Sequence, residues 1–178
     1  IDSNSNLLSL EQCLGIYQDS QASSSSSNIS SSNNSNNNSN VNFVDGSWYH
    51  KGDRNSVEEF QTGPRIPGSI YFDVTDICAS PDATNLFCML PEKQLCAAAC
   101  TAWNIRETEH VIIYGREGAY FTPRVWFTWK QAMGHSGRVS LMQASLEEWI
   151  MAGGPVDNEG GASVLRAQDL DVSQEPVN

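Results

Sequence analysis

Basic residues are scarce in this sequence. Lys and Arg together number 10 against 21 Asp and Glu, and the formal net charge is −11. A surface that binds nucleic acid or an anionic membrane needs clustered Lys and Arg, so the composition argues against both partners. The sequence also lacks an apolar run that approaches the length of a membrane span. It begins at Ile1 without a basic-then-apolar signal segment, and we expect a processed chain or a piece of a longer one.

Cysteine is present in an odd number and forms no recognisable disulfide framework. The five cysteines are Cys13, Cys78, Cys88, Cys96 and Cys100. Free thiols in a reducing intracellular compartment are the simpler interpretation. Cys96 and Cys100 lie one helical turn apart, the spacing of half a metal site, but no second Cys or His pair complements them. We therefore expect buried structural thiols, no metal and no cofactor.

Residue variety is almost absent between Ser20 and Asn42, where nearly every residue is Ser or Asn. Such a stretch buries too little apolar surface to offset its ordering entropy. We expect a disordered insert at 20–42, an expanded surface loop that interrupts one domain over 1–156. The composition becomes polar again at Asp157, and we expect 157–178 to be a tail or the start of an interdomain linker.

Apolar runs and helix-capping patterns predict strands that alternate with helices. The expected strands cover 43–45, 70–72, 111–114 and 139–141. The expected helices comprise a first one that ends near Tyr17 and longer ones over 92–103 and 123–133. Capping-box patterns at Ser9, Ser56 and Ser145 indicate helix starts. This alternation is typical of an α/β fold, a parallel sheet covered by helices on both faces.

The strand expected at 111–114 leads into a loop with two glycines and then into a helix start at Thr122-Pro123. Many α/β proteins build an anion cradle from a buried strand, a glycine loop and a helix N-terminus. The loop residues are Gly115, Arg116, Glu117, Gly118, Ala119 and Tyr120. The sequence therefore predicts the shape of an anion site in this loop.

Several motifs occur together in a characteristic order. They are Asp45-x-Ser47-Trp48, Ile66-Pro67-Gly68 followed by Phe72-Asp73, Pro123-Arg124-Val125-Trp126, and Gly134-His135. Together they resemble the rhodanese superfamily, and within it the amino-terminal domain of two-domain thiosulfate and 3-mercaptopyruvate sulfurtransferases. The resemblance covers roughly 7–156, apart from the insert. It implies a rhodanese-like three-layer domain with a central parallel sheet flanked by helices.

The resemblance also implies where sulfur chemistry would occur. Active members carry a cysteine at the end of the fourth strand, which takes sulfane sulfur from a donor, holds it as a persulfide and passes it to a nucleophile such as cyanide or another thiol. That position falls on Gly115, and no cysteine follows Cys100. Glu117 would also place a carboxylate in or near the cradle. We therefore expect a degenerate active-site loop and no catalytic residue in this chain.

Three further positions are expected at an interdomain cleft: Thr75, Cys88 and Arg124. Mercaptopyruvate-type members have a carboxylate where Thr75 stands and a histidine where Cys88 stands, so their replacement favours a thiosulfate-type or drifted enzyme. A Gly-Gly pair of the family is also replaced, by Ala144-Ser145. Arg124 lies at a helix start, where a cation is unfavourable, so we expect a role at an interface or in a buried ion pair with Asp45 or Asp73.

The resemblance leads to a first hypothesis of function. The chain would be the non-catalytic half of a sulfurtransferase, whose partners are a catalytic rhodanese domain C-terminal to it and a small sulfur donor at the interdomain cleft. Family members occur in mitochondria and in the cytosol, so an intracellular location is expected. The alternative is a degenerate rhodanese module that binds or regulates a partner and catalyses nothing.

Overall fold

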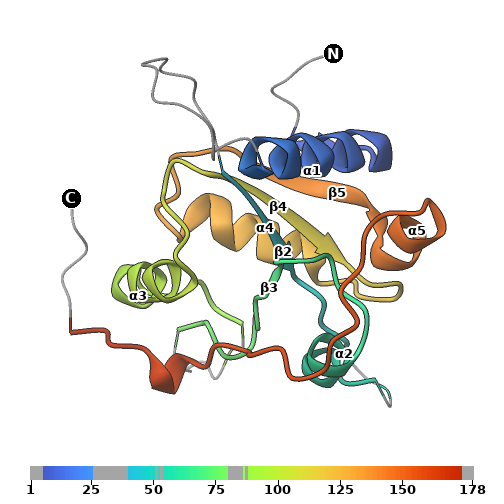
Figure 1. Ribbon diagram of the computed structural model, residues 1–178. Helices are drawn as coiled ribbons and strands as arrows, with labels where there is room; N and C mark the ends of the chain where they lie inside the picture. The colour runs from blue at the N-terminus through green and yellow to red at the C-terminus, as the bar shows by residue number, and fades with distance from the viewer. Residues whose placement is uncertain are drawn as a thin grey trace, which may run out of the picture.

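The computed structural model describes residues 6–25, 40–50, 52, 54–79, 86 and 88–173. Its centre is a five-stranded sheet in the order β1-β5-β4-β2-β3, and every strand pair is parallel (Figure 1). The strands are β1 (Leu7–Leu8), β2 (Val41–Asp45), β3 (Ile70–Tyr71), β4 (His110–Gly115) and β5 (Val139–Ser145). The helices are α1 (Leu10–Ser25), α2 (Ser56–Thr62), α3 (Lys93–Trp103), α4 (Thr122–Gln131) and α5 (Leu146–Met151), followed by a 3-10 turn, η1 (Ala167–Asp169).

The central strand β4 divides the interior into two hydrophobic clusters. Successive side chains of a strand point to opposite faces. Val111 and Ile113 therefore pack with α3 and α4, whereas Ile112 and Tyr114 pack with α1 and α5. All four side chains are fully buried. The predicted three-layer α/β fold with a parallel sheet flanked by helices is thus confirmed.

Parallel strands bring their carboxyl ends to one edge of the sheet, where ligand sites of open α/β sheets form. Asp45 at the end of β2 is in register with Tyr71 of β3 and with Tyr114 of β4. The register between β4 and β5 shifts after Ile113, so that Gly115 lies opposite Ser145. The loops that follow β2, β3 and β4 consequently meet at this edge.

Several expected element boundaries need correction. Helix α1 runs to Ser25 rather than ending near Tyr17, because neither Pro nor Gly occurs between Ile16 and Ser25. Within it, Ser20 Oγ donates to the Tyr17 carbonyl at 2.7 Å. Strand β1 was not predicted, since two residues carry no periodic signal, and β5 extends to Ser145.

Two of the three expected capping boxes are confirmed. At α1, Ser9 and Gln12 exchange the two capping hydrogen bonds, and at α5 Ser145 and Glu148 do the same. The box expected at Ser56 is wrong by one residue, because Asn55 is the N-cap of α2. The Ser56 hydroxyl instead bonds the Tyr71 hydroxyl in the interior, at 2.8 Å.

The polar segments expected at 20–42 and after Asp157 contain ordered elements. Helix α1 includes 20–25 and β2 begins at Val41, while residues 26–39 of the insert lie outside the described residues. The segment 157–173, here called the docked segment, runs past α2 and β3 toward α3 (Figure 1). Two ion pairs hold it, Arg65 with Asp157 and Arg166 with Asp73, and Leu165 and Leu170 pack against the core. The polar composition after Asp157 did not predict this packing.

None of the helices in the described ranges is long and apolar enough to cross a membrane.

A buried histidine at the start of β4 makes stability depend on pH. His110 is 8% exposed and its Nε2 lies 3.0 Å from Ser140 Oγ. Burial is the largest cause that lowers the pKa of His110 from 6.5 to about 4, and the positive charges of Arg138 and His135 add to it. Because the folded pKa lies below the unfolded one, this group's stabilisation is complete above pH 6.5 and is lost as the pH falls toward about 4.

We predict that, between neutral pH and about pH 4.5, the free energy of unfolding of His110→Gln falls by about 2–3 kcal/mol less than that of the wild type. Denaturant unfolding at a series of pH values measures this difference. The same substitution at the exposed His50 is the control and should leave the profile of the wild type unchanged. Identical pH profiles for His110→Gln and the wild type would contradict this assignment.

Candidate functional site

The predicted strand, loop and helix around residues 111–131 are present in the structure. Strand β4 ends at Gly115, the loop of residues 116–121 follows, and α4 starts at Thr122 with Pro123 in its first turn. Proline suits this position because the first helical amides have no intrahelical acceptor. The loop lies at the carboxyl edge of the sheet, where an anion cradle was expected.

The space beside Gly115 is filled by the side chain of Thr122. A Cβ atom added at Gly115 would lie 2.1 Å from Thr122 Oγ1 and 3.1 Å from its Cβ and Cγ2. Thr122 is itself buried, and its hydroxyl donates a hydrogen bond to the Ala119 carbonyl at 3.0 Å. Since a neighbouring atom cannot approach a Cβ so closely, this arrangement accepts only glycine at position 115. A cysteine side chain does not fit there.

Three amides of the loop donate within the protein. The Arg116 amide bonds Ser47 Oγ at 2.9 Å, the Glu117 amide bonds Glu147 Oε2 at 2.8 Å, and the Ala119 amide bonds the Arg116 carbonyl at 3.0 Å. In a functional cradle such amides point at the bound anion. Here a carboxylate from α5 already occupies one of them.

The side chain of Glu117, expected in or near the cradle, is exposed. A second carboxylate, which the sequence did not indicate, reaches the loop from Glu147. Glu147 lies in the first turn of α5, directly after the strand that neighbours β4, so the sheet order brings it to the loop. The distance along the chain hid this neighbour from the sequence.

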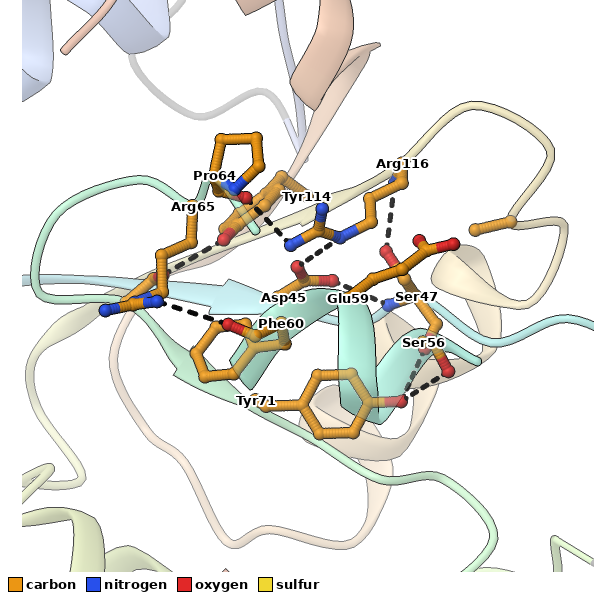
Figure 2. A network of polar contacts seen from close by, with 12 residues as sticks. Asp45, Ser47, Ser56, Glu59, Phe60, Pro64, Arg65, Tyr71, Tyr114 and Arg116 are labelled. Carbon is orange, nitrogen blue, oxygen red and sulfur yellow. Dashed lines mark hydrogen bonds and ion pairs between the residues drawn. The ribbon is translucent and has the colours of Figure 1, made fainter. Parts of the chain in front are cut away.

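Arg116 turns inward and forms a buried ion pair. Its Nε donates to Asp45 Oδ2 at 3.2 Å and its Nη2 to the Pro64 carbonyl at 2.9 Å (Figure 2). The two side chains are 5% and 0% exposed. Burial raises the pKa of Asp45, and the guanidinium and the Ser47 amide oppose that rise. The guanidinium is thus committed to the interior of the domain rather than offered to a ligand.

The same network fixes the base of the loop. The Ser47 amide donates to Asp45 Oδ1 at 3.0 Å, and the Tyr71 hydroxyl donates to the Ser47 carbonyl at 2.8 Å (Figure 2). The ends of β2, β3 and β4 are therefore tied together through Asp45, Ser47 and Arg116. Removing one partner of a buried ion pair leaves the other charge uncompensated, which costs about 3–5 kcal/mol.

The structure brings Arg124 and Cys88 together. Arg124 Nη2 donates to the Cys88 carbonyl at 2.7 Å, and its guanidinium lies 5.4 Å from the centre of the Phe127 ring. The expected ion pair of Arg124 with Asp45 or Asp73 is wrong. Both carboxylates have other partners, because Asp45 binds Arg116 and Asp73 binds Arg166 from the docked segment.

Thr75 lies in the loop after β3, and its amide and hydroxyl both donate to Asp73 Oδ1, at 3.0 and 2.6 Å. The Cys78 thiol donates to the Thr75 carbonyl at 3.1 Å. The next residue, Ala79, donates its amide to the carbonyl of Met89, the neighbour of Cys88, at 3.4 Å. The three expected cleft residues thus lie on one side of the carboxyl edge, with Cys78 as an unpredicted member.

No cysteine of the chain is activated as a nucleophile. Burial raises the pKa of Cys88 and Cys96 to about 11 and that of Cys13 and Cys100 to about 12. It also raises the pKa of Cys78. All five are free thiols. Since the thiolate is the reactive form, these environments are typical of structural cysteines.

Within the described ranges, no group of three or more His, Cys, Asp or Glu side chains could hold a metal ion. A cavity of about 430 Å³ lies beside the loops after β2 and β3, lined in part by Trp48, Arg54 and Asp73. The Arg54 guanidinium in it is already paired with Glu59 at 2.7 Å and lies 4.2 Å from the centre of the Tyr49 ring. Among the described residues that line this cavity, the one cation, Arg54, is therefore already paired.

Solved structures share the fold of this chain. The crystal structure of the 3-mercaptopyruvate sulfotransferase SseA from Escherichia coli, described as a rhodanese fold, superposes with a TM-score of 0.65 and 20% identity, over 91% of this chain and 53% of that one. The Tum1 protein from Saccharomyces cerevisiae gives a TM-score of 0.61 and 22% identity, over 89% and 45%. At these identities the likeness establishes the rhodanese fold.

Sequence relatives define the family further. Thiosulfate/3-mercaptopyruvate sulfurtransferase 2 and the mitochondrial sulfurtransferase 1 of Arabidopsis thaliana are each 31% identical over 130 residues, or 72% of this chain. The chain spans 36% and 33% of their lengths, about a third. No family model matches the chain. With this fold and these homologues, the chain belongs to the rhodanese superfamily.

The contact between Thr122 and Gly115 makes a measurable prediction. Gly115→Ala should lower the free energy of unfolding by about 2–3 kcal/mol, because the added methyl group overlaps Thr122 Oγ1. The double variant Gly115→Ala/Thr122→Ala should be more stable than Gly115→Ala, since the oxygen at 2.1 Å is gone. Denaturant unfolding of both proteins measures the difference.

Gly15→Ala is the matched control, because no atom lies within 4 Å of its added Cβ and the residue is inside α1. It should raise stability by about 0.5–1 kcal/mol. A Gly115→Ala protein as stable as the wild type would show that Thr122 does not fill this space.

Proposed function

We propose that this chain is the N-terminal, non-catalytic rhodanese domain of a sulfurtransferase. In the complete protein, sulfur from thiosulfate or 3-mercaptopyruvate would pass to a thiol or cyanide through a cysteine persulfide on a second rhodanese domain. Gly115 takes the position of the family's cysteine in this first domain. The proposal extends to the residues of the degenerate loop, 115–120, and to a cleft lined by Thr75, Cys88 and Arg124.

The observation that carries the proposal is the filled space at Gly115. A rhodanese domain that had merely lost its cysteine would leave an open cradle, whereas here Thr122, Ser47 and Glu147 satisfy or occupy the loop. Such a loop supports the fold of the domain and not a reaction. Homology to enzymes that are about twice as long as this chain supports a second domain for the chemistry.

The chain's own residues suit a wall of an interdomain cleft. Three large apolar side chains are exposed: Tyr120 in the loop after β4, Phe127 in α4, and Met89 next to Cys88. Arg124 lies between Tyr120 and Phe127 in the sequence and donates a hydrogen bond to the Cys88 carbonyl. These apolar side chains, 86%, 39% and 39% exposed, are the kind that a second domain covers. Thr75 and Cys88 in place of the expected carboxylate and histidine favour thiosulfate over 3-mercaptopyruvate as the donor.

An intracellular location, in mitochondria or the cytosol, accompanies this proposal. One relative is a mitochondrial protein by its name, and the free thiols suit a reducing compartment.

The test is intact-mass spectrometry of the chain after incubation with thiosulfate and, separately, with 3-mercaptopyruvate. We predict that the chain gains no sulfur atom removable by cyanide. The natural full-length protein should gain one, on a cysteine beyond Asn178. The raised pKa of all five thiols and the filled space at Gly115 are the physical reasons for the first result.

A stoichiometric adduct on this chain would overturn the proposal, and peptide mapping with a Cys88→Ser variant would identify the residue. A full-length protein that forms no persulfide, yet binds a partner through this domain, would favour the degenerate binding module instead.

A further inference from the structure

Thr75, a residue of the proposed cleft, stands on a turn that one buried carboxylate holds together. The turn covers 73–77, after β3, and is closed by a hydrogen bond from the Ile77 amide to the Asp73 carbonyl at 2.9 Å. Asp73 Oδ1 accepts from the amide and the hydroxyl of Thr75, at 3.0 and 2.6 Å. Asp73 is buried, whereas Thr75 is exposed. The place of the Thr75 hydroxyl therefore depends on where the Asp73 carboxylate points.

The docked segment binds this turn from the other side. Arg166 Nη1 donates to Asp73 Oδ2 at 3.1 Å, and the Ala167 amide donates to Asp76 Oδ2 at 2.7 Å. These bonds join residues that lie 93 and 91 positions apart in the chain. Both carboxylates of the turn thus accept a hydrogen bond from the docked segment, and the two bonds together restrict its orientation.

Apolar contacts on both sides keep Arg166 in place. Leu165 precedes it and Leu170 follows η1, and both pack against the hydrophobic cluster that includes Ile77 of the turn. The side chains of Arg166 and Asp73 are 40% and 6% exposed. An exposed ion pair gains little when two flexible side chains must first be ordered. Here one partner is buried and the backbone of the other is anchored by its neighbours, so this cost is smaller.

The turn is also a wall of the cavity of about 430 Å³ beside the loops after β2 and β3. Asp73 and Thr75 line this cavity together with Trp48 and Tyr71. A shift of the turn therefore changes the shape of the cavity as well as the place of the Thr75 hydroxyl. A displacement of about 1 Å in a binding wall is enough to affect how a substrate is held.

We propose that Arg166 is a positioning residue of the donor cleft. It holds the Asp73 carboxylate, and this carboxylate orients the turn that carries Thr75. The docked segment, from which the chain would continue to the second domain, is thus coupled to the wall of the cleft. The inference rests on the proposed function for the role of the cleft, but the coupling itself can be measured in this chain alone.

The first measurement is the exchange of the Thr75 and Ile77 amide hydrogens with water in the chain of 178 residues, followed by NMR. Arg166→Gln should speed exchange at both amides about three- to tenfold, because Asp73 loses a charge-assisted hydrogen bond. Arg166→Lys keeps the charge and should restore most of the protection. Amides of the central strand β4 should exchange as in the wild type, which separates a local effect from a loss of global stability.

Arg106→Gln is the matched control, because it also removes an arginine from a pair with a carboxylate. Arg106 is 78% exposed and its partner Glu109 directly precedes β4, so exchange at Thr75 should not change.

Ala167→Pro is a second, independent variant that removes only the amide bound to Asp76. Arg166 already has the extended backbone that a residue before proline needs, with φ −111° and ψ 140°. This variant should also speed exchange in the turn.

The second measurement uses the natural full-length protein. Arg166→Gln should raise KM for thiosulfate about three- to tenfold and change kcat by less than about twofold, because the turn contributes to donor binding and not to the reacting cysteine. Arg166→Lys should recover most of the loss. Unchanged exchange at Thr75 and Ile77 in Arg166→Gln, or an unchanged KM, would overturn the inference. A full-length wild type that forms no persulfide would instead contradict the proposed function, and the exchange rates would still decide whether Arg166 positions the turn.

Discussion

The close approach of the Thr122 side chain to Gly115 determines the character of the site. Strand β4 ends at this glycine, and the first residue of α4 returns its hydroxyl into the space where a side chain would stand, 2.1 Å from the position of a Cβ. The loop is short, so the helix start and the strand end cannot separate without rebuilding the loop. With the space closed, a nucleophile at the strand end is excluded by sterics before any question of its pKa arises.

Other contacts follow from the same closure. The loop lies against the domain, where its amides meet Ser47 and Glu147 and its first side chain meets Asp45. The side chains of Arg116 and Asp45 are 5% and 0% exposed. Their ion pair is tolerated in the interior because the Ser47 amide donates to Asp45 and Arg116 donates to the Pro64 carbonyl. The loop that would bind an anion in an active copy here connects three strand ends. These contacts fit the proposed non-catalytic role better than a site awaiting a ligand.

The sequence was sufficient for the fold and for the place of the loop. The apolar run at 111–114, the glycines after it and the capping boxes at Ser9 and Ser145 are local signals, and the structure agrees with them. The missing cysteine was also visible. The partners of the loop were not, because Glu147 and Ser47 reach it across the sheet from distant positions in the chain.

Contacts between distant parts of the chain also explain why the ion-pair partners expected for Arg124 were wrong. Asp45 and Asp73 were expected as candidate partners, but they form ion pairs with Arg116 and Arg166 instead. Arg166 arrives from the docked segment, whose polar composition concealed its contacts with the core. The hydrogen bond between the segments that hold Cys78 and Cys88 was also missed, since nothing in their spacing along the chain indicates it.

We propose that the loop of residues 115–120 does not bind anions. The most direct measurement is a titration of the isotope-labelled chain with thiosulfate, followed through the backbone amide signals of Arg116, Glu117 and Ala119 by NMR. The account predicts that these signals do not shift beyond those of a chloride control of equal ionic strength, because the three amides already donate to Ser47, Glu147 and Arg116. Saturable shifts at these amides would show an open cradle and contradict the account.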